Sequence, residues 1–430
     1  MDLGEKISIL AAAAKYDASC ASSGGTPHGG ASQGGSEDKG HGKNRRGFGV
    51  NVPTGVCHSW AGDGRCVSLL KVLYSNVCRY DCAYCINRAS ADVPRASFTV
   101  DELVELTCEF YRRNYIEGLF LSSGIFADSD MVMEKLIATA RKLRTEAGYG
   151  GYIHLKVIPG TGDKIIREAG RWADRLSANI ELPTDKSLQT LAPQKSGKVI
   201  LGAMEDVAEA SAEYEEDRWR IRSTPDFAPA GQSTQLIVGA SEENDRQIIT
   251  LSGALYRKFG LRRVYYSAFI PVGSPGWGGL PDPRLPDIPG PPLVREHRLY
   301  QADWLLRFYH FTAGEILEDS SYLDKHLDPK TARALKHPEH FPVEVSRADY
   351  EELLRVPGIG AKSSRRIIET RRSRSLTFDS LRRLGVILKR ARYFITVTGA
   401  ALDKLDDPRR VRRILADSDG AGFQLPLFEF

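Results

Sequence analysis

The sequence predicts an α/β fold: a partial, TIM-like (β/α)6 barrel followed by a small all-α domain at the C-terminus. Short runs of β-branched and aromatic residues alternate with longer helical patterns between about residues 67 and 272. This alternation is typical of parallel strands joined by right-handed helical crossovers. Six runs are too few for a complete eightfold barrel. A separate basic region near the C-terminus adds the second domain.

Most of the predicted strands alternate with helical segments along the chain. We expect them at residues 67–74, 118–122, 152–158, 175–182, 234–238 and 263–272. The clearest helices are 101–115 and 130–146, and Asp101 is the expected N-cap of the first. Because catalytic groups of such barrels lie at the C-terminal ends of the strands, the chemistry is expected there.

Composition divides the 430 residues into five parts. Residues 1–66 form an N-terminal extension, in which the Gly- and Ser-rich stretch 22–48 predicts a disordered insertion. The barrel is expected at 67–310, a helical connection at 311–344, a small helical domain at 345–398 and a flexible tail at 399–430. With 42% hydrophobic residues the chain has enough apolar side chains for a sizeable core.

The chain carries no sign of export or membrane insertion. No apolar run approaches the roughly 18 residues of a membrane span, and the N-terminus lacks the basic region of a secretory signal. We therefore expect a cytoplasmic protein with no membrane partner. In that setting its seven cysteines are read first as metal ligands and not as disulfides.

Three of these cysteines form a compact motif, Cys78-Arg-Tyr-Asp-Cys82-Ala-Tyr-Cys85, directly after the first predicted strand. Three thiolates on a four-iron cluster leave one iron without a protein ligand, and an open position is what a catalytic metal centre needs. A zinc site completed by Cys66, Cys57 or His58 is the alternative. Zinc sites favour paired CxxC units, so the CxxxCxxC spacing favours the iron–sulfur cluster.

The cysteine motif resembles the signature of the radical S-adenosylmethionine (SAM) superfamily. The resemblance implies that Cys78, Cys82 and Cys85 hold a [4Fe–4S] cluster and that SAM chelates the open iron. Reductive cleavage of SAM would then give a 5′-deoxyadenosyl radical that abstracts a hydrogen atom from the substrate. A flavodoxin- or ferredoxin-type protein is the expected reductant.

The same resemblance suggests where SAM binds. Tyr84 is expected to pack beside the cluster. Ser122, Ser123 and Gly124 stand where the family has a Gly-Gly-Glu-like turn, although the acidic residue is missing here.

Two later strands add further candidates. Asn179 and Glu181 resemble the polar pair that reaches the ribose or methionyl group. Ile237, Gly239 and Glu242 resemble the IxGxxE element beside the adenine. The alternative for that element is that Gly239 permits a tight strand exit and Glu242 starts a helix.

A second cluster or metal is an additional hypothesis. Cys57, His58 and Cys66 lie just upstream of the motif, and Cys20 precedes the Gly-rich stretch. Together they could ligate a metal that supports electron transfer. Isolated cysteines are also common as small buried hydrophobic residues, and this alternative stays open.

The basic region points to a polyanion. Residues 347–413 contain 18 Lys and Arg against 8 Asp and Glu, a net charge of +10 in a chain of net charge +4. Within it, Pro357-Gly358-Ile359-Gly360 lies between two helical patterns and is followed by three basic residues, Lys362, Arg365 and Arg366. Glycines allow a tight turn, and the amides of the next helix then face a phosphate.

This segment resembles a helix-hairpin-helix DNA-binding module at residues 345–398, with a degenerate second copy around Gly385. Such a module would bind the nucleic-acid backbone without reading the bases. A glycine turn that only joins two helices is the alternative.

The last residues form an apolar peptide after a polar stretch. Gln424, Leu425, Leu427 and Phe428 resemble the peptide that binds the bacterial sliding clamp. The alternative is that the peptide folds back on its own domain.

Nearly the whole chain resembles a bacterial family of radical SAM proteins assigned to DNA modification or repair. The resemblance implies an enzyme that modifies or repairs DNA, with nucleic acid, DNA above all, as its partner. The alternatives are an RNA-modifying radical SAM enzyme and a non-catalytic, redox-sensing iron–sulfur protein that binds DNA.

Overall fold

The computed structural model describes residues 1–15, 56–60, 66–271, 282–403 and 405–420. The chain divides into two compact units. The first consists of Met1–Ser241 and Phe259–Pro291, and the second of Glu242–Lys258 and Pro292–Phe430. The predicted insertion at 22–48, Cys20 and the peptide 424–428 lie outside the described residues.

A seven-stranded sheet is the framework of the first unit. Its strands follow the chain in order: β1 (Val56–Trp60), β2 (Cys66–Leu73), β3 (Gly118–Ser122), β4 (Tyr152–Lys156), β5 (Arg175–Ser177), β6 (Gln232–Val238) and β7 (Arg263–Ala268). β2 to β7 are all parallel, and β1 pairs antiparallel with β2 at the edge. The predicted α/β fold with a six-stranded parallel half-barrel is confirmed, and β1 is an addition to it.

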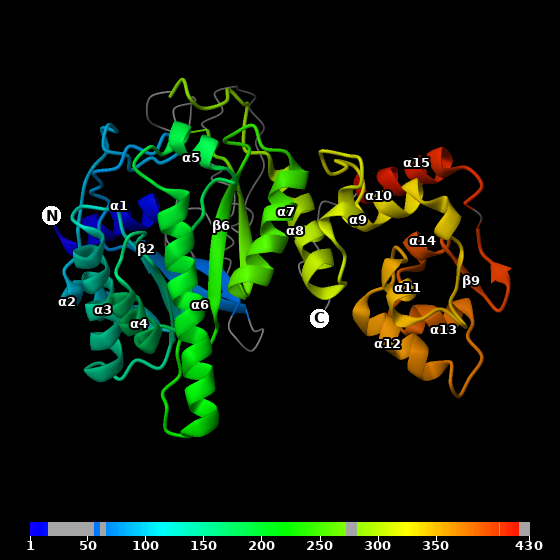
Figure 1. Cartoon of the computed structure of the whole chain (residues 1–430), viewed down its shortest axis with the longest axis horizontal. Helices are drawn as coiled ribbons and strands as arrows, with labels where there is room; N and C mark the ends of the chain where they lie inside the picture. The colour runs from blue at the N-terminus through cyan, green and yellow to red at the C-terminus, as the bar shows by residue number, and fades with distance from the viewer. Residues whose placement is uncertain (16–55, 61–65, 272–281, 404, 421–430) are drawn as a thin grey trace, which may run out of the picture. The chain divides into compact units, whose positions relative to one another are not determined.

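The helices of this unit are α1 (Leu3–Lys15), α2 (Val100–Arg112), α3 (Ser129–Thr145), α4 (Asp163–Trp172), α5 (Asp185–Leu191) and α6 (Gly197–Arg220). Helices α2, α3, α4 and α6 pack side by side in chain order (Figure 1). The predicted N-cap Asp101 is wrong. Thr99 caps α2, because its hydroxyl accepts a hydrogen bond from the Glu102 amide while the Glu102 carboxylate accepts one from the Thr99 amide.

Strand β5 ends five residues earlier than predicted. The Ile180 amide is held by the Thr234 hydroxyl at 3.0 Å instead of by a strand carbonyl. Glu181 then adopts φ +64°, a left-handed conformation that is rare for a residue with a side chain. A single bridge from Glu181 to Leu236 restores pairing with β6. The carboxyl end of β5 is therefore bent, which matters for the site described below.

The second unit is mostly helical. Its helices are α7 (Asp245–Phe259, apart from its last residue), α8 (Leu293–Phe308), α9 (Ala313–Leu317), α10 (Pro329–Lys336), η1 (Pro338–His340), α11 (Tyr350–Arg355), α12 (Ala361–Thr370), α13 (Phe378–Arg383), α14 (Leu388–Ala391) and α15 (Pro408–Gly420). Leu353, Ile367, Leu381 and Phe394 are fully or almost fully buried at its centre.

The prediction that the C-terminal domain is all-α is wrong in one respect. Strands β8 (Val343–Glu344), β9 (Ile395–Val397) and β10 (Ala400–Ala401) form a small sheet in the order β10-β9-β8. The Val343 amide donates to the Phe394 carbonyl at 2.8 Å, which joins the start of the domain to its end. The β-branched run of β9 has a strand signature, whereas its partners β8 and β10 are each only two residues long.

Among the described residues, none of the helices is both long enough and apolar enough to cross a bilayer.

Candidate functional site

The three motif cysteines meet at one cavity of the first unit. They lie in a turn-rich loop that leaves the carboxyl end of β2, and Cys78, Cys82 and Cys85 all line the cavity. None of the three is in a disulfide. Burial raises the pKa of the Cys85 thiol to about 12 and also raises that of Cys82. A bound cation would be needed to favour the thiolates at neutral pH.

Arg95 organises the backbone of the cysteine loop. Its guanidinium donates to four carbonyl oxygens, those of Asn76, Asn87, Arg88 and Ala91, at 2.7–2.8 Å. Carbonyls on both sides of the motif thus share one cation. Since a guanidinium presents its donors in a fixed planar fork, it holds the two sides of the loop in register.

Gly124 fits the end of β3 against the same loop. Its amide donates to the Ser75 carbonyl at 2.7 Å. A Cβ at this position would lie 2.4 Å from the Val77 carbonyl oxygen, one residue before Cys78. The position therefore has no room for a side chain, and the adjoining Ser123 and Gly124 line the cavity. This close approach is a packing reason for the glycine that holds whether or not SAM touches it.

A buried cluster of charges lines the same cavity and contacts the cysteine loop at Tyr84. The Lys195 ammonium is 3.0 Å from Glu181 Oε1 and 3.3 Å from the Tyr84 hydroxyl, and Lys156 Nζ is 3.5 Å from the same Glu181 oxygen. Burial alone would lower the pKa of Lys195, but the charge of Glu181 raises it well above its ordinary value. Two cations and one carboxylate thus share a largely buried site, and their charges leave a net of +1.

The backbone around Glu181 is fixed by β6. The Glu181 amide donates to the Gln235 carbonyl at 2.9 Å, and the Ile237 amide donates to the Glu181 carbonyl at 2.7 Å. Its left-handed conformation costs of the order of 1–3 kcal/mol. Such strain persists only where surrounding contacts over-determine it, and these two hydrogen bonds do so.

An amide chain continues the polar wall. Asn179 Nδ2 donates to Gln235 Oε1 at 3.2 Å, and Gln235 Nε2 donates to the Ser267 hydroxyl at 3.2 Å. These residues come from the carboxyl halves of β5, β6 and β7 or just beyond. The chain fixes which way each amide points.

The cavity brings together most of the residues predicted for cofactor binding. Besides the cysteines it is lined by Tyr84, Ser123, Gly124, Asn179, Glu181 and Ile237. The other three do not line it: Ser122 is buried at the end of β3, Gly239 is a left-handed glycine just after β6, and Glu242 is exposed at the start of the second unit.

The sequence analysis missed Lys156, Lys195, Gln235 and Ser267, which also line the cavity. Lys156 had a visible signal, because it is a charged residue at the end of a mostly apolar strand. Lys195 had none, since it follows α5 in an irregular segment.

The candidates for a second metal are only partly described. Cys57 and His58 lie on β1, where Cys57 pairs with Leu69 and His58 with Ser68, and Cys66 pairs with Trp60 at the start of β2. Cys20 lies outside the described residues. The second metal stays a prediction.

The predicted hairpin lies between α11 and α12 in the second unit. Gly358 has φ +81°, and Gly360 is the N-cap of α12 with no side-chain hydrogen bond to the helix amides. Lys362, Arg365 and Arg366 on α12 are exposed, whereas Pro357 and Ile359 are buried beneath the turn. An uncapped helix start with exposed cations is a suitable place for an anion.

The second glycine turn packs against the first. The Ile387 amide donates to the Gly358 carbonyl at 2.9 Å, and a Cβ on Gly358 would lie 2.6 Å from the Ile387 carbonyl oxygen. In return, Gly385, with φ +92°, faces Ser363 on the first turn of α12. Each turn therefore contacts the other's helix start, which makes the two hairpins one packed pair.

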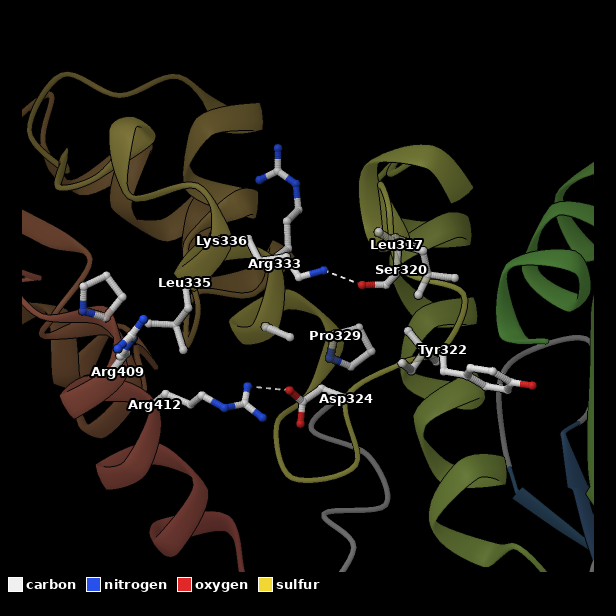
Figure 2. Close-up of a pocket in the computed structure, with 14 residues that line it drawn as sticks. Leu317, Ser320, Tyr322, Asp324, Pro329, Arg333, Leu335, Lys336, Arg409 and Arg412 are labelled. Carbon is white, nitrogen blue, oxygen red and sulfur yellow. Dashed lines mark hydrogen bonds and ion pairs between the residues drawn. The ribbon is translucent and has the colours of Figure 1, made fainter.

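A second cavity, of about 280 Å³, lies within the second unit (Figure 2). Leu317 and Ser320 line one side, Arg333 and Lys336 of α10 line another, and Arg412 reaches in from α15. The Lys336 ammonium donates to the Ser320 hydroxyl at 2.6 Å, and Arg412 forms an ion pair with Asp324.

Comparison with known protein families gives a match within the first unit. Residues 72–214 match the model of the radical SAM superfamily, so this chain carries a radical SAM superfamily domain. The family implies a [4Fe–4S] cluster and SAM, and the three clustered thiols that line a cavity are the donor set that such a cluster requires.

Three solved structures align with part of the chain at low identity and low TM-score. The [FeFe]-hydrogenase maturase HydG aligns at 15% identity and a TM-score of 0.39, over 54% of this chain and 48% of HydG. Methylornithine synthase (PylB) aligns at 14% identity and a TM-score of 0.38, over 54% of this chain and 60% of PylB. A radical SAM methyltransferase from Sphaerobacter thermophilus aligns at 14% identity and a TM-score of 0.37, over 56% of this chain and 67% of the methyltransferase. The chain thus spans about half the length of HydG, and no curated protein matches it.

Proposed function

We propose that this protein is a radical SAM enzyme that modifies or repairs DNA, with its chemistry in the first unit and its nucleic-acid binding in the second. The observation that carries the chemical part is the single cavity shared by the three cysteines and the Glu181 charge cluster. When bound, the cluster and SAM supply a 5′-deoxyadenosyl radical. Cys78, Cys82 and Cys85 would hold the cluster.

The protein's own groups suit the amino-acid end of SAM. Lys195 and Lys156 offer cations for its carboxylate, and Glu181 offers an acceptor for an N–H of its amino group. Because these three side chains are largely buried, their interactions with a ligand are screened less than they would be at the surface. The amide of Asn179, held by Gln235, is placed for a hydroxyl or a ring nitrogen.

Iron content and product formation test this part together. Anaerobic reconstitution followed by dithionite and SAM should give 5′-deoxyadenosine, and Cys78→Ala, Cys82→Ala and Cys85→Ala should each abolish it. Cys108→Ala is the matched control, because Cys108 is a buried thiol on α2 away from the cavity. A cluster that is reduced but never cleaves SAM would favour the redox-sensing alternative.

The DNA substrate is supported by the paired hairpins. Two glycine turns that pack on each other, an uncapped helix start and a region of net charge +10 fit a backbone-binding surface. A nucleobase inside a duplex could not enter the cavity, so the target would be flipped out or single-stranded. The peptide at 424–428 would add a contact with the sliding clamp, and Leu427→Ala with Phe428→Ala should remove that contact.

Salt dependence tests the hairpin surface. Lys362→Glu should weaken binding to double-stranded DNA and lower the slope of log affinity against log salt by at least about 1. Arg372→Glu is the control, because this exposed residue lies beyond the opposite end of the ten-residue α12, about 15 Å away. Equal effects of both variants would indicate diffuse attraction and would contradict the hairpin site. Tighter binding of an RNA duplex than of DNA would favour the RNA-modifying alternative.

A further inference from the structure

Two histidines and a glutamate gather where α10 ends. The sequence His337-Pro-Glu-His340 runs from the last residue before η1 to the end of η1. His337 Nδ1 is 2.9 Å from Glu339 Oε1, and His340 Nε2 is 3.8 Å from the same oxygen. One ligand atom from each of the three residues lies within 4.8 Å of the others. Among the described residues, no other group of three His, Cys, Asp or Glu is arranged in this way.

These spacings fit the ligand set of a small divalent cation. Zinc takes nitrogen ligands at about 2.0–2.1 Å and carboxylate oxygens at about 2.0–2.2 Å, so tetrahedral ligand atoms lie about 3.3–3.5 Å apart. The observed 2.9 and 3.8 Å fall on either side of that range. The two imidazole rings are also close, with centroids 5.7 Å apart and planes 27° apart. Shifts of about half an ångström would therefore bring these two distances into the range for one ion, and the ligand atoms already lie within 4.8 Å of one another.

A fourth residue fixes the orientation of the least exposed ligand. His337 Nε2 is 2.8 Å from Glu318 Oε2, and only 18% of the His337 side chain is exposed. A neutral imidazole has a single N–H, so donation from Nε2 to Glu318 leaves a lone pair on Nδ1, which faces Glu339. A carboxylate that accepts the second N–H is the usual support of a metal-bound histidine. This contact is independent of the three-residue cluster.

Glu318 is itself held in place. It is the C-cap of α9, has φ +43°, and donates its amide to the Gly314 carbonyl at 2.6 Å. A non-glycine residue in this conformation needs support from its surroundings. The cluster therefore connects the end of α9 with the end of α10.

We propose that His337, Glu339 and His340 bind a divalent transition-metal ion such as Zn²⁺, with Glu318 positioning His337. The remaining coordination position faces solvent, since the Glu339 and His340 side chains are each 60% exposed. The ion clips α9 to α10 beside the cavity of Figure 2, where Lys336 and Ser320 already form one link between its two sides. The site is separate from the cysteine loop and does not depend on the proposed reaction.

Zinc titration of the full-length chain tests the site. Cys78, Cys82 and Cys85 are replaced together by serine as the background, so that their thiols do not take up zinc. Isothermal titration should then show that His337→Ala and His340→Ala each lose one equivalent of bound Zn²⁺. The matched control His326→Ala should retain it, because His326 is an exposed histidine of the same unit outside the cluster.

Glu318→Gln provides a readout that a merely structural histidine would not give. It leaves all three ligands intact and should weaken zinc binding about 10- to 100-fold. Zinc should also raise the melting temperature of the background protein and not that of His337→Ala. Unchanged stoichiometry in both histidine variants, or an equal loss in His326→Ala, would overturn the proposal.

Discussion

Gly358 allows a sharp test of the paired hairpins. Its φ is +81°, and a Cβ there would lie 2.6 Å from the Ile387 carbonyl oxygen and 3.1 Å from the Ala391 amide nitrogen. Both atoms belong to backbone, which cannot move aside as the end of a flexible side chain does. Gly358→Ala should therefore force the two hairpins apart.

The cost has two separable parts. A left-handed alanine costs roughly 1–2 kcal/mol relative to glycine. Relieving the clash should add about 1–3 kcal/mol of packing strain and about 1 kcal/mol for the 2.9 Å hydrogen bond from the Ile387 amide to the Gly358 carbonyl. Gly399→Ala isolates the first part, because Gly399 has φ +82° and no atom within 4 Å of its virtual Cβ.

Scanning calorimetry of the full chain measures the difference. Gly399→Ala should lower the free energy of unfolding by about 1–2 kcal/mol and Gly358→Ala by about 3–6 kcal/mol. At about 2–4 °C per kcal/mol, the second variant should melt at least about 4 °C below the first. It should also bind DNA more weakly. Equal melting temperatures for the two variants would refute the packing of the hairpins on each other.

Three further predictions concern single positions. Gly124→Ala should lower the iron bound per chain after reconstitution, because its Cβ would displace the Val77 carbonyl oxygen 2.4 Å away. The control Gly202→Ala, whose Cβ would have no atom within 4 Å, should keep the full iron content, and equal iron contents of the two variants would contradict the prediction. Burial lowers the pKa of Lys330 to about 7, so between pH 7 and about 10.5 the folded protein holds one proton fewer than the unfolded chain. The free energy of unfolding should therefore rise by up to about 1.4 kcal/mol per pH unit relative to that of Lys330→Met. Urea titrations at several pH values would measure this, and parallel pH profiles of the two proteins would rule it out. Burial alone would raise the pKa of Glu344, but hydrogen bonds from backbone amides lower this pKa to about 2. The stability that the carboxylate adds is therefore complete above about pH 4.5 and is lost toward pH 2. Glu344→Gln should flatten the acid unfolding curve in this window, and an unchanged acid midpoint would count against the prediction.

Most of the six parallel strands could be predicted because they are short runs of apolar, β-branched or aromatic residues whose interior is buried. The end of β5 could not, since it depends on the Thr234 hydroxyl, which is 54 positions away from Ile180 in sequence. The left-handed conformation of Glu181 depends on the same neighbouring strand. A local sequence pattern carries no information about which distant group accepts a hydrogen bond from a given backbone amide.

The same distinction separates the two halves of the candidate site. The cysteine loop is contiguous, so its spacing alone indicated that the three thiols act together. Lys195 joins the site only through folding, since it sits 111 positions from Tyr84 and follows no recognisable motif. In the C-terminal domain the glycine turns were visible in sequence, whereas the contact between Gly358 and Ile387 required the fold.

We propose that the cysteine cavity cleaves SAM for a reaction on DNA. The direct test is the rate of 5′-deoxyadenosine formation by the anaerobically reconstituted protein, measured with single-stranded DNA, with duplex DNA, with RNA and without nucleic acid. We predict that one DNA form raises the rate and that Lys362→Glu removes the stimulation while leaving the basal rate in place. A rate that is indifferent to every nucleic acid, or that RNA alone raises, would contradict the DNA assignment.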